Sequence, residues 1–212
     1  MKKSKKELFV SVGLLTALVI WTLLAKFVDV KAIGPNSSQV GLATINSFVH
    51  RLFGVHMSLY IITDWLGLVP LFISFAFAIF GLIQWIKRKY ILNVDTDVLI
   101  LGMFYIAVLT VFVLFEKIAL NYRPILINGV LEASYPSSTT LLVMCVMPTT
   151  AIQLNKRMIN SKIKRFILTG ICVFTAFMVI GRLVSGVHWF SDIVGGALTS
   201  AVLVTMYHYF IN

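Results

Sequence analysis

The sequence predicts an all-α, polytopic membrane protein: a single domain over residues 1–212, built as a bundle of six transmembrane helices. Hydrophobic residues make up 59% of the chain and charged residues only 12%, whereas soluble domains are about half apolar and about a quarter charged. The charges are also missing from six long windows. A soluble core made of helices that are apolar on every face would need a larger chain to enclose it.

The six windows without Asp, Glu, Lys or Arg suit the thickness of a bilayer, because a helix crosses the hydrocarbon core with roughly 17–25 mostly apolar residues. They are residues 8–25, 65–86, 98–115, 133–155, 166–181 and 193–212. The fifth is slightly short, and the fourth reaches full length only by including the polar residues 137–140. We therefore predict six spans.

Four lysines precede the first window, which raises the alternative of a cleaved signal peptide. The apolar region of a signal peptide is about 7–15 residues long and ends in small residues. Here the apolar run has 18 residues and ends Leu-Leu-Ala-Lys-Phe. An uncleaved signal-anchor helix is the better interpretation.

The basic residues predict the orientation. With a cytoplasmic N-terminus, 12 of the 18 Lys and Arg residues fall on the inner side, as the positive-inside rule requires. They are Lys2, Lys3, Lys5, Lys6, Lys87, Arg88, Lys89, Lys156, Arg157, Lys162, Lys164 and Arg165. We expect a multi-pass cell-membrane protein with both termini in the cytoplasm, whose basic partners are anionic membrane lipids and not nucleic acid.

The first outer connection, residues 27–64, is the longest and opens with the turn-forming residues 34–38. Its later part mixes apolar residues with Asn46, His50, Arg51 and His56. Two interpretations stay open: a helix along the membrane interface, or an irregular lid.

Polar residues gather in the two other outer connections, residues 116–136 and 182–192. His188 and Asp192 are four residues apart, so they share a face if the last helix begins near Gly186. A carboxylate beside an imidazole fixes its tautomer and stabilises the positive ring, which suits a histidine nucleophile or base. Ionisable residues at membrane depth usually serve function, although a helix cap at the interface is the alternative.

Other polar groups on this face are suited to phosphate. Arg182 offers a forked guanidinium, and Ser137 and Ser138 stand at a helix N-terminus, which attracts anions. Lys117 and Arg123 add two cations. Taken singly, the serines also fit a plain helix cap, and the two cations fit interfacial snorkelling.

In combination these residues resemble the type 2 phosphatidic acid phosphatase family, whose relatives include the vanadium haloperoxidases. The family pattern is Lys-x6-Arg-Pro, then Pro-Ser-Gly-His, then Ser-Arg-x5-His-x3-Asp. The third element reads Gly-Arg-Leu-Val-Ser-Gly-Val-His-Trp-Phe-Ser-Asp over residues 181–192, and Gly195-Gly196 follow, in keeping with close helix packing. The motifs span residues 117–196, and the six-span layout covers the whole chain.

The resemblance implies a hydrolase that removes phosphate from a lipid at the outer membrane face without metal or other cofactor. His188 would form a phosphohistidine, and Asp192 would orient it. The phosphate would be held by cations and by the start of a helix: Arg123 and Arg182, with Lys117 as a helper, and Ser137 with the N–H of Ser138.

Two departures from the pattern affect this expectation. Five residues, not six, separate Lys117 from Arg123, which turns Lys117 by about 100° on a helix. Ser138-Thr139 replaces Gly-His, so the family's proton donor to the leaving oxygen is missing. His50 and His56 are the candidates for a substitute donor on the same side.

The missing histidine suggests the substrate. General acid help is worth about 10²–10⁴-fold, but a phosphate monoester leaves easily because its second pKa is about 6. An isoprenyl diphosphate such as undecaprenyl diphosphate therefore fits better than a phospholipid monoester such as phosphatidic acid. The alternative is a weakened or inactive family member that binds a lipid phosphate or a membrane partner. A transporter ranks last, since the spans lack a proton relay or a pair of broken helices.

Overall fold

The computed structural model describes residues 2–211, and within them the side chains of residues 6–211. The side chains of Lys2, Lys3 and Lys5, which enter the charge count above, lie outside the described part, and so does Asn212, the end of the sixth predicted window.

The described part is helical, with isolated β-bridges and no strand. The helices are α1 (Lys2–Phe27), α2 (Ala43–Phe53), α3 (Met57–Leu66), α4 (Leu68–Arg88), α5 (Thr96–Ile118), α6 (Ser138–Arg157), α7 (Ser161–Val184) and α8 (Phe190–Ile211). The predicted all-α fold class is confirmed.

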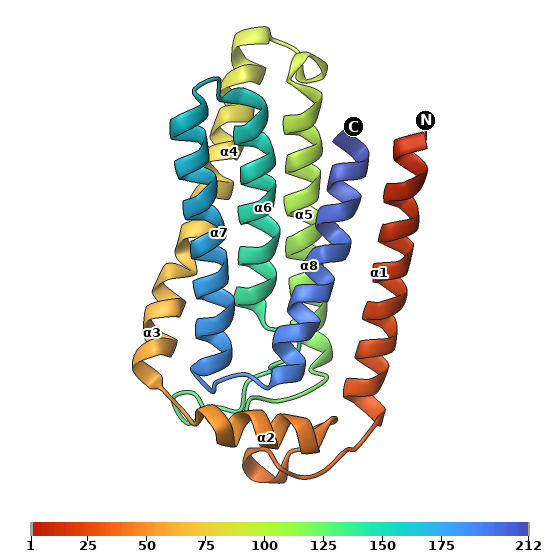
Figure 1. Ribbon diagram of the computed structural model, residues 1–212, viewed down its shortest axis with the longest axis vertical. Helices are drawn as coiled ribbons and strands as arrows, with labels where there is room; N and C mark the ends of the chain where they lie inside the picture. The colour runs from red at the N-terminus through yellow and green to blue at the C-terminus, as the bar shows by residue number, and fades with distance from the viewer. Residues whose placement is uncertain (1, 212) are drawn as a thin grey trace.

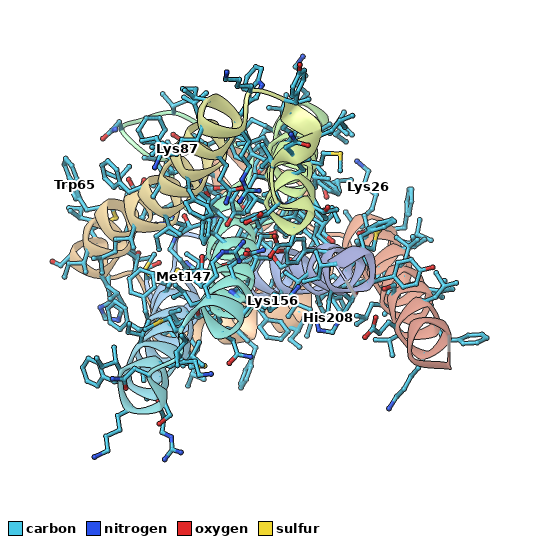
Figure 2. All side chains as sticks on the ribbon, turned by 90° about the horizontal axis from the view of Figure 1, so that it is seen from above. Lys26, Trp65, Lys87, Met147, Lys156 and His208 are labelled. Carbon is cyan, nitrogen blue, oxygen red and sulfur yellow. The ribbon has the colours of Figure 1, made fainter. Side chains whose placement is uncertain are left out.

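Among the described residues, five helical segments are long and apolar enough to cross a membrane, and α3 with α4 forms one of them, Met57–Arg88. Of the six predicted spans, the fourth, which corresponds to α6, is outside this set. Figure 2 shows α6 in the middle of the bundle, where Thr149, Thr150 and Gln153 are buried. Because neighbouring helices surround α6, its polar side chains bond to protein and not to lipid; Gln153 donates to the Tyr207 hydroxyl of α8.

The second span begins earlier than predicted, at Met57 and not near residue 65. The charge of Asp64 had marked the limit of the apolar window. In the structure Asp64 Oδ1 lies 3.5 Å from Nη1 of Arg182 on α7, so this charge is paired with the neighbouring helix. The helix continues through it.

The two ends of the bundle differ (Figure 1). Both termini lie at one end, together with the α4–α5 and α6–α7 connections. The other end is covered by α2, which lies across the bundle. Of the two interpretations of residues 27–64, a helix on this end is therefore the one that the structure supports, although other parts of the segment are irregular.

The helix α2 holds the connection between α7 and α8. The Asn46 side chain accepts from the Ser191 N–H at 3.0 Å and donates to the Ser191 hydroxyl at 3.0 Å. His50 Nε2 lies 3.2 Å from the Gly186 carbonyl oxygen. Gly186 has φ +69°, and a Cβ there would collide with the carbonyl oxygen of Gly54, so only glycine fits this crossing.

The start of α8 differs from the sequence prediction. It begins at Phe190, and not near Gly186, because the left-handed conformation of Gly186 interrupts the helix. His188 therefore lies in the connection before α8. The predicted close packing at Gly195 and Gly196 is present: Gly195 abuts the Tyr135 ring, and Gly196 abuts Ser137 and Thr140 at the start of α6.

Candidate active site

His188 lies at the α2-covered end of the bundle and is 3% exposed. Its Nδ1 lies 3.2 Å from the Ser134 hydroxyl oxygen. Its Nε2 is buried and has no hydrogen-bond partner among the described residues. A buried ring nitrogen without a partner is costly in a structural role, which makes Nε2 the candidate reactive atom of this site.

Asp192 is fully buried and reaches His188 by way of Ser134. The Ser134 hydroxyl donates to Asp192 Oδ2, and the Trp189 N–H donates to the same oxygen at 2.8 Å. Asp192 Oδ2 and His188 Nδ1 are 3.8 Å apart, within ion-pair range but longer than a hydrogen bond. With Nδ1 as the protonated nitrogen, His188 donates to Ser134, Ser134 donates to Asp192, and Nε2 keeps its lone pair.

The pKa of His188 is lowered to about 4, mainly because burial disfavours a charged ring and also because Arg123 and Arg182 carry positive charges. Asp192 acts in the opposite direction. The ring is therefore neutral at pH 7. A neutral imidazole with an unpaired Nε2 is the form that can attack phosphorus.

Arg182 extends from α7 and is buried, at 1% exposure. Its Nη1 lies 3.4 Å from the Thr63 hydroxyl and 3.5 Å from Asp64 Oδ1. Its guanidinium carbon lies 4.9 Å from the centre of the Tyr60 ring, whereas its Nε has no partner among the described residues. The carboxylate and the ring fix the guanidinium and leave one donor unused.

Arg123 comes from the connection between α5 and α6. Its N–H bonds to the Glu132 carbonyl oxygen at 3.1 Å, and its Nε lies 3.1 Å from Glu132 Oε2. Its guanidinium carbon is 5.9 Å from the centre of the same Tyr60 ring. Its Nη1 is buried and has no partner among the described residues. Two guanidinium groups with unused donors thus flank one aromatic ring, an arrangement suited to an anion.

The predicted serines have different environments. Ser137 is the N-cap of α6, where its hydroxyl oxygen accepts from the Thr140 N–H at 3.5 Å and the Thr140 hydroxyl at 3.0 Å. Its own N–H donates to the Asp192 carbonyl oxygen at 3.0 Å. Ser138 lines a small cavity together with His188 and Arg123. Ser138 is thus at the cavity wall, whereas Ser137 fixes the start of α6 against α8.

Thr139 faces a different hollow. It lines an apolar groove of about 310 Å³ between α4, α5 and α6. The groove also includes Ser138, Phe112 and Leu141, which line the His188 cavity as well. The groove and the cavity therefore share a wall, and the position at which the family pattern has a histidine lies on the groove side of that wall.

Lys117 is the predicted site residue that the structure does not bring to the cavity. It is exposed on the last turn of α5, and the cavity is lined instead by Phe112, Phe115 and Glu116. The helix ends at Ile118, so Arg123 is not on the same helix as Lys117. Lys117 points away because it is about 100° around α5 from Glu116, the neighbour that lines the cavity.

Sequence reasoning missed two residues here, Ser134 and Glu116. Ser134 precedes the second motif, and only the fold brings it between His188 and Asp192. Glu116 could have been found, because six residues separate it from Arg123, which is the spacing of the lysine in the family pattern. Lys117 was predicted because it has the residue type of the family pattern, whereas Glu116 has its position.

The histidines considered as substitute proton donors lie elsewhere. His50 bonds to Gly186 and packs on the Trp189 ring, with ring centres 5.4 Å apart. His56 Nε2 lies 2.8 Å from the Phe53 carbonyl oxygen, and the residue is exposed. Neither lines the cavity. Over the described residues, no group of three His, Cys, Asp or Glu side chains is arranged to hold a metal ion.

The chain is similar to known proteins in part of its sequence and in its fold. Residues 121–212 match the family model described as PAP2 superfamily, and this segment contains every predicted site residue except Lys117. The structure is similar to the crystal structure of the first transmembrane PAP2 type phosphatidylglycerolphosphate phosphatase from Bacillus subtilis. The TM-score is 0.61 at 20% identity, over 96% of this chain and 96% of that chain. Among curated proteins, none matches the chain.

Proposed function

We propose that this chain, of which residues 121–212 match the PAP2 superfamily model, is a membrane lipid-phosphate phosphatase whose nucleophile is His188. One observation carries the proposal: Nε2 of His188 is buried without a partner, in a site where Arg123 and Arg182 also have unused donors. The similar Bacillus subtilis structure is named as a phosphatase of phosphatidylglycerolphosphate, which supports a phosphorylated lipid as the class of substrate.

In the proposed reaction, His188 Nε2 forms a bond to phosphorus while the bond between phosphorus and the leaving oxygen breaks. The ring then carries a positive charge, which Asp192 stabilises through Ser134. Arg123 and Arg182 bind the oxygens that are equatorial at phosphorus, and the first amides of α6 at Ser138 add donors. Donors that are fixed before the reaction stabilise the transferring group at little reorganisation cost. Water then cleaves the phosphorus–nitrogen bond and releases phosphate.

For the substrate, we propose an isoprenyl diphosphate such as undecaprenyl diphosphate. Thr139 cannot replace histidine as a proton donor, and a diphosphate releases a lipid monophosphate whose second pKa is about 6. The apolar groove of about 310 Å³ beside the cavity supports a lipid chain in this position. A second candidate, favoured by the same Thr139, is a protein that binds lipid phosphate without turnover.

The orientation is part of the proposal. Lys87, Arg88, Lys156 and Arg157 belong to the ends of α4 and α6 that lie with the termini, opposite the His188 cavity (Figure 1). Basic residues concentrate on the cytoplasmic side of membrane proteins, which supports an outward-facing site.

The test is release of phosphate by the purified protein from undecaprenyl diphosphate, phosphatidic acid and phosphatidylglycerophosphate. We expect turnover of the diphosphate to be fastest, to survive EDTA, and to be lost in His188→Ala. His56→Ala is the matched control, since His56 is exposed outside the cavity, and it should keep full activity.

The possible results of this assay distinguish the enzyme proposal, the non-catalytic candidate and the leaving-group argument. No His188-dependent release from any of the three lipids would overturn the enzyme proposal. Binding of vanadate or phosphate without release would select the non-catalytic candidate instead. Faster release from phosphatidic acid than from the diphosphate would overturn the leaving-group argument while leaving the phosphatase intact.

A further inference from the structure

Glu116 is an acidic residue in the wall of the cavity that contains His188. It belongs to the last turn of α5, and it lines the cavity together with His188, Arg123 and Ser138. Phe112 and Phe115 precede it on the same helix face, and the Phe115 ring packs on Tyr135 with ring centres 5.9 Å apart. This packing fixes the helix turn from which Glu116 extends.

The proposed reaction needs a proton acceptor in its second half. In the first half, the lipid monophosphate can depart from a diphosphate without receiving a proton. The second half has a separate requirement, because water must then attack the phosphohistidine. The attacking water has to lose a proton whatever lipid was the substrate. General base help in such a step is worth about 10²–10⁴-fold, and a threonine at position 139 cannot provide it.

The other acidic groups near the site are already engaged. Glu132 lies 3.1 Å from Arg123 Nε, and Asp64 lies 3.5 Å from Arg182 Nη1. Asp192 accepts from Ser134 and Trp189. None of these three lines the cavity that contains His188, whereas Glu116 does. Glu116 is also exposed, so it borders the cavity on a side that water can reach.

We propose that Glu116 is the general base for the second half of the reaction, and the proposal rests on the phosphatase function above. The Glu116 carboxylate takes a proton from water as the water oxygen bonds to phosphorus. The bond between phosphorus and His188 Nε2 breaks, and its electron pair returns to the ring. Phosphate leaves, and Glu116 gives its proton back to solvent. Atoms and charge balance without a further reactant.

The test separates the two half-reactions. Wild type, Glu116→Gln and Lys117→Gln are mixed with farnesyl diphosphate labelled with ³²P in its terminal phosphate. Samples are quenched in alkali, where phosphohistidine survives, and the labelled protein and free phosphate are both counted. Lys117 is the matched control, because it is the next residue on the helix but lies outside the cavity.

We expect Glu116→Gln to form the phosphoenzyme at nearly the wild-type rate and to accumulate it to about one equivalent. Its steady-state phosphate release should fall about 10²-fold or more. Glu116→Asp should recover part of the rate, and Lys117→Gln should match wild type in both measurements. A purely structural role for Glu116 would lower phosphoenzyme formation and would not cause accumulation.

Two results would count against the assignment, and they are distinguishable. If Glu116→Gln slows phosphoenzyme formation as much as phosphate release, or leaves both unchanged, Glu116 is not the base and the phosphatase proposal stands. If wild type neither forms a phosphoenzyme nor releases phosphate, the phosphatase proposal itself is overturned, and the role of Glu116 with it.

Discussion

At the scale of single residues, the site depends on how His188 is held. The ring is neutral and buried, one nitrogen is bound to Ser134, and the other has no partner among the described residues. Asp192 stabilises positive charge on the ring only through Ser134, because the direct separation of 3.8 Å exceeds a hydrogen bond. We therefore propose Ser134 as a positioning residue for the proposed nucleophile, although it lies outside the three sequence motifs.

The role of Ser134 can be measured. Ser134→Ala removes the hydroxyl between His188 and Asp192, so the ring loses both its orientation and its link to the carboxylate. We expect kcat to fall about 10²-fold, as small misplacements of catalytic groups do, with little change in KM. Ser200→Ala is the control, since Ser200 is equally buried and bonds to carbonyl oxygens within the bundle. A rise in KM with an unchanged kcat would contradict this role.

At the scale of elements, close packing holds the segment before α6 against the start of α8. The beginning of α8 packs against the Tyr135–Ser137 segment that leads into α6, and both contacts need glycine, at Gly195 and Gly196. Tyr135 is itself fixed from α1, because its hydroxyl lies 2.8 Å from the Thr22 hydroxyl. Three helices thus determine where Ser134 lies relative to Asp192.

This packing leads to a stability prediction. A Cβ at Gly195 would lie 2.5 Å from Tyr135 Cε2, so Gly195→Ala must displace a buried ring. We expect a loss of about 1–3 kcal/mol of unfolding free energy, seen as a lower midpoint of thermal unfolding in detergent. Gly102→Ala on α5 is the control, because nothing lies within 4 Å of a Cβ there, and alanine favours a helix by about 1 kcal/mol. Equal midpoints for the two variants would show that the contact is not tight.

At the scale of the whole molecule, the two ends of the bundle carry different kinds of residues. One end carries the site and α2, and the other carries the termini and the short basic connections (Figure 1). A polar helix, α6, runs between these ends through the middle of the bundle. It can be polar because the surrounding helices shield it from lipid, which is why it falls outside the set of apolar spans.

Orientation in the membrane is testable by labelling. In a background with Cys145→Ala and Cys172→Ala, a single cysteine is introduced as Val130→Cys at the site end or as Ile159→Cys between α6 and α7. Both positions are exposed, at 59% and 98%. We expect an impermeant maleimide to label Val130→Cys in intact cells and Ile159→Cys only after permeabilisation. The reverse pattern would place the site in the cytoplasm.

The sequence alone predicted the fold class and most of the residues that the structure gathers at the candidate site. Apolar windows fix helices because the bilayer offers no partner to unsatisfied backbone groups, so six helices could be predicted from composition and length. The motif residues come from different helices and connections, and the structure brings them together. Arg123, Ser138 and His188 line one cavity, Arg123 and Arg182 lie beside the same Tyr60 ring, and Asp192 lies 3.8 Å from His188. Their chemical roles stay predictions until the assays above are made.

Only the tertiary structure decided which further residues share that site. Ser134 lies far from His188 along the chain, and no periodicity could place its hydroxyl between the ring and Asp192. On α5, neighbouring residues point about 100° apart, so the adjacent glutamate and lysine cannot both face the cavity. Lys117 therefore faces outward, and Glu116 borders the cavity. Sequence patterns specify the types of residue, but the rotation of each helix in the packed bundle decides which of them meet.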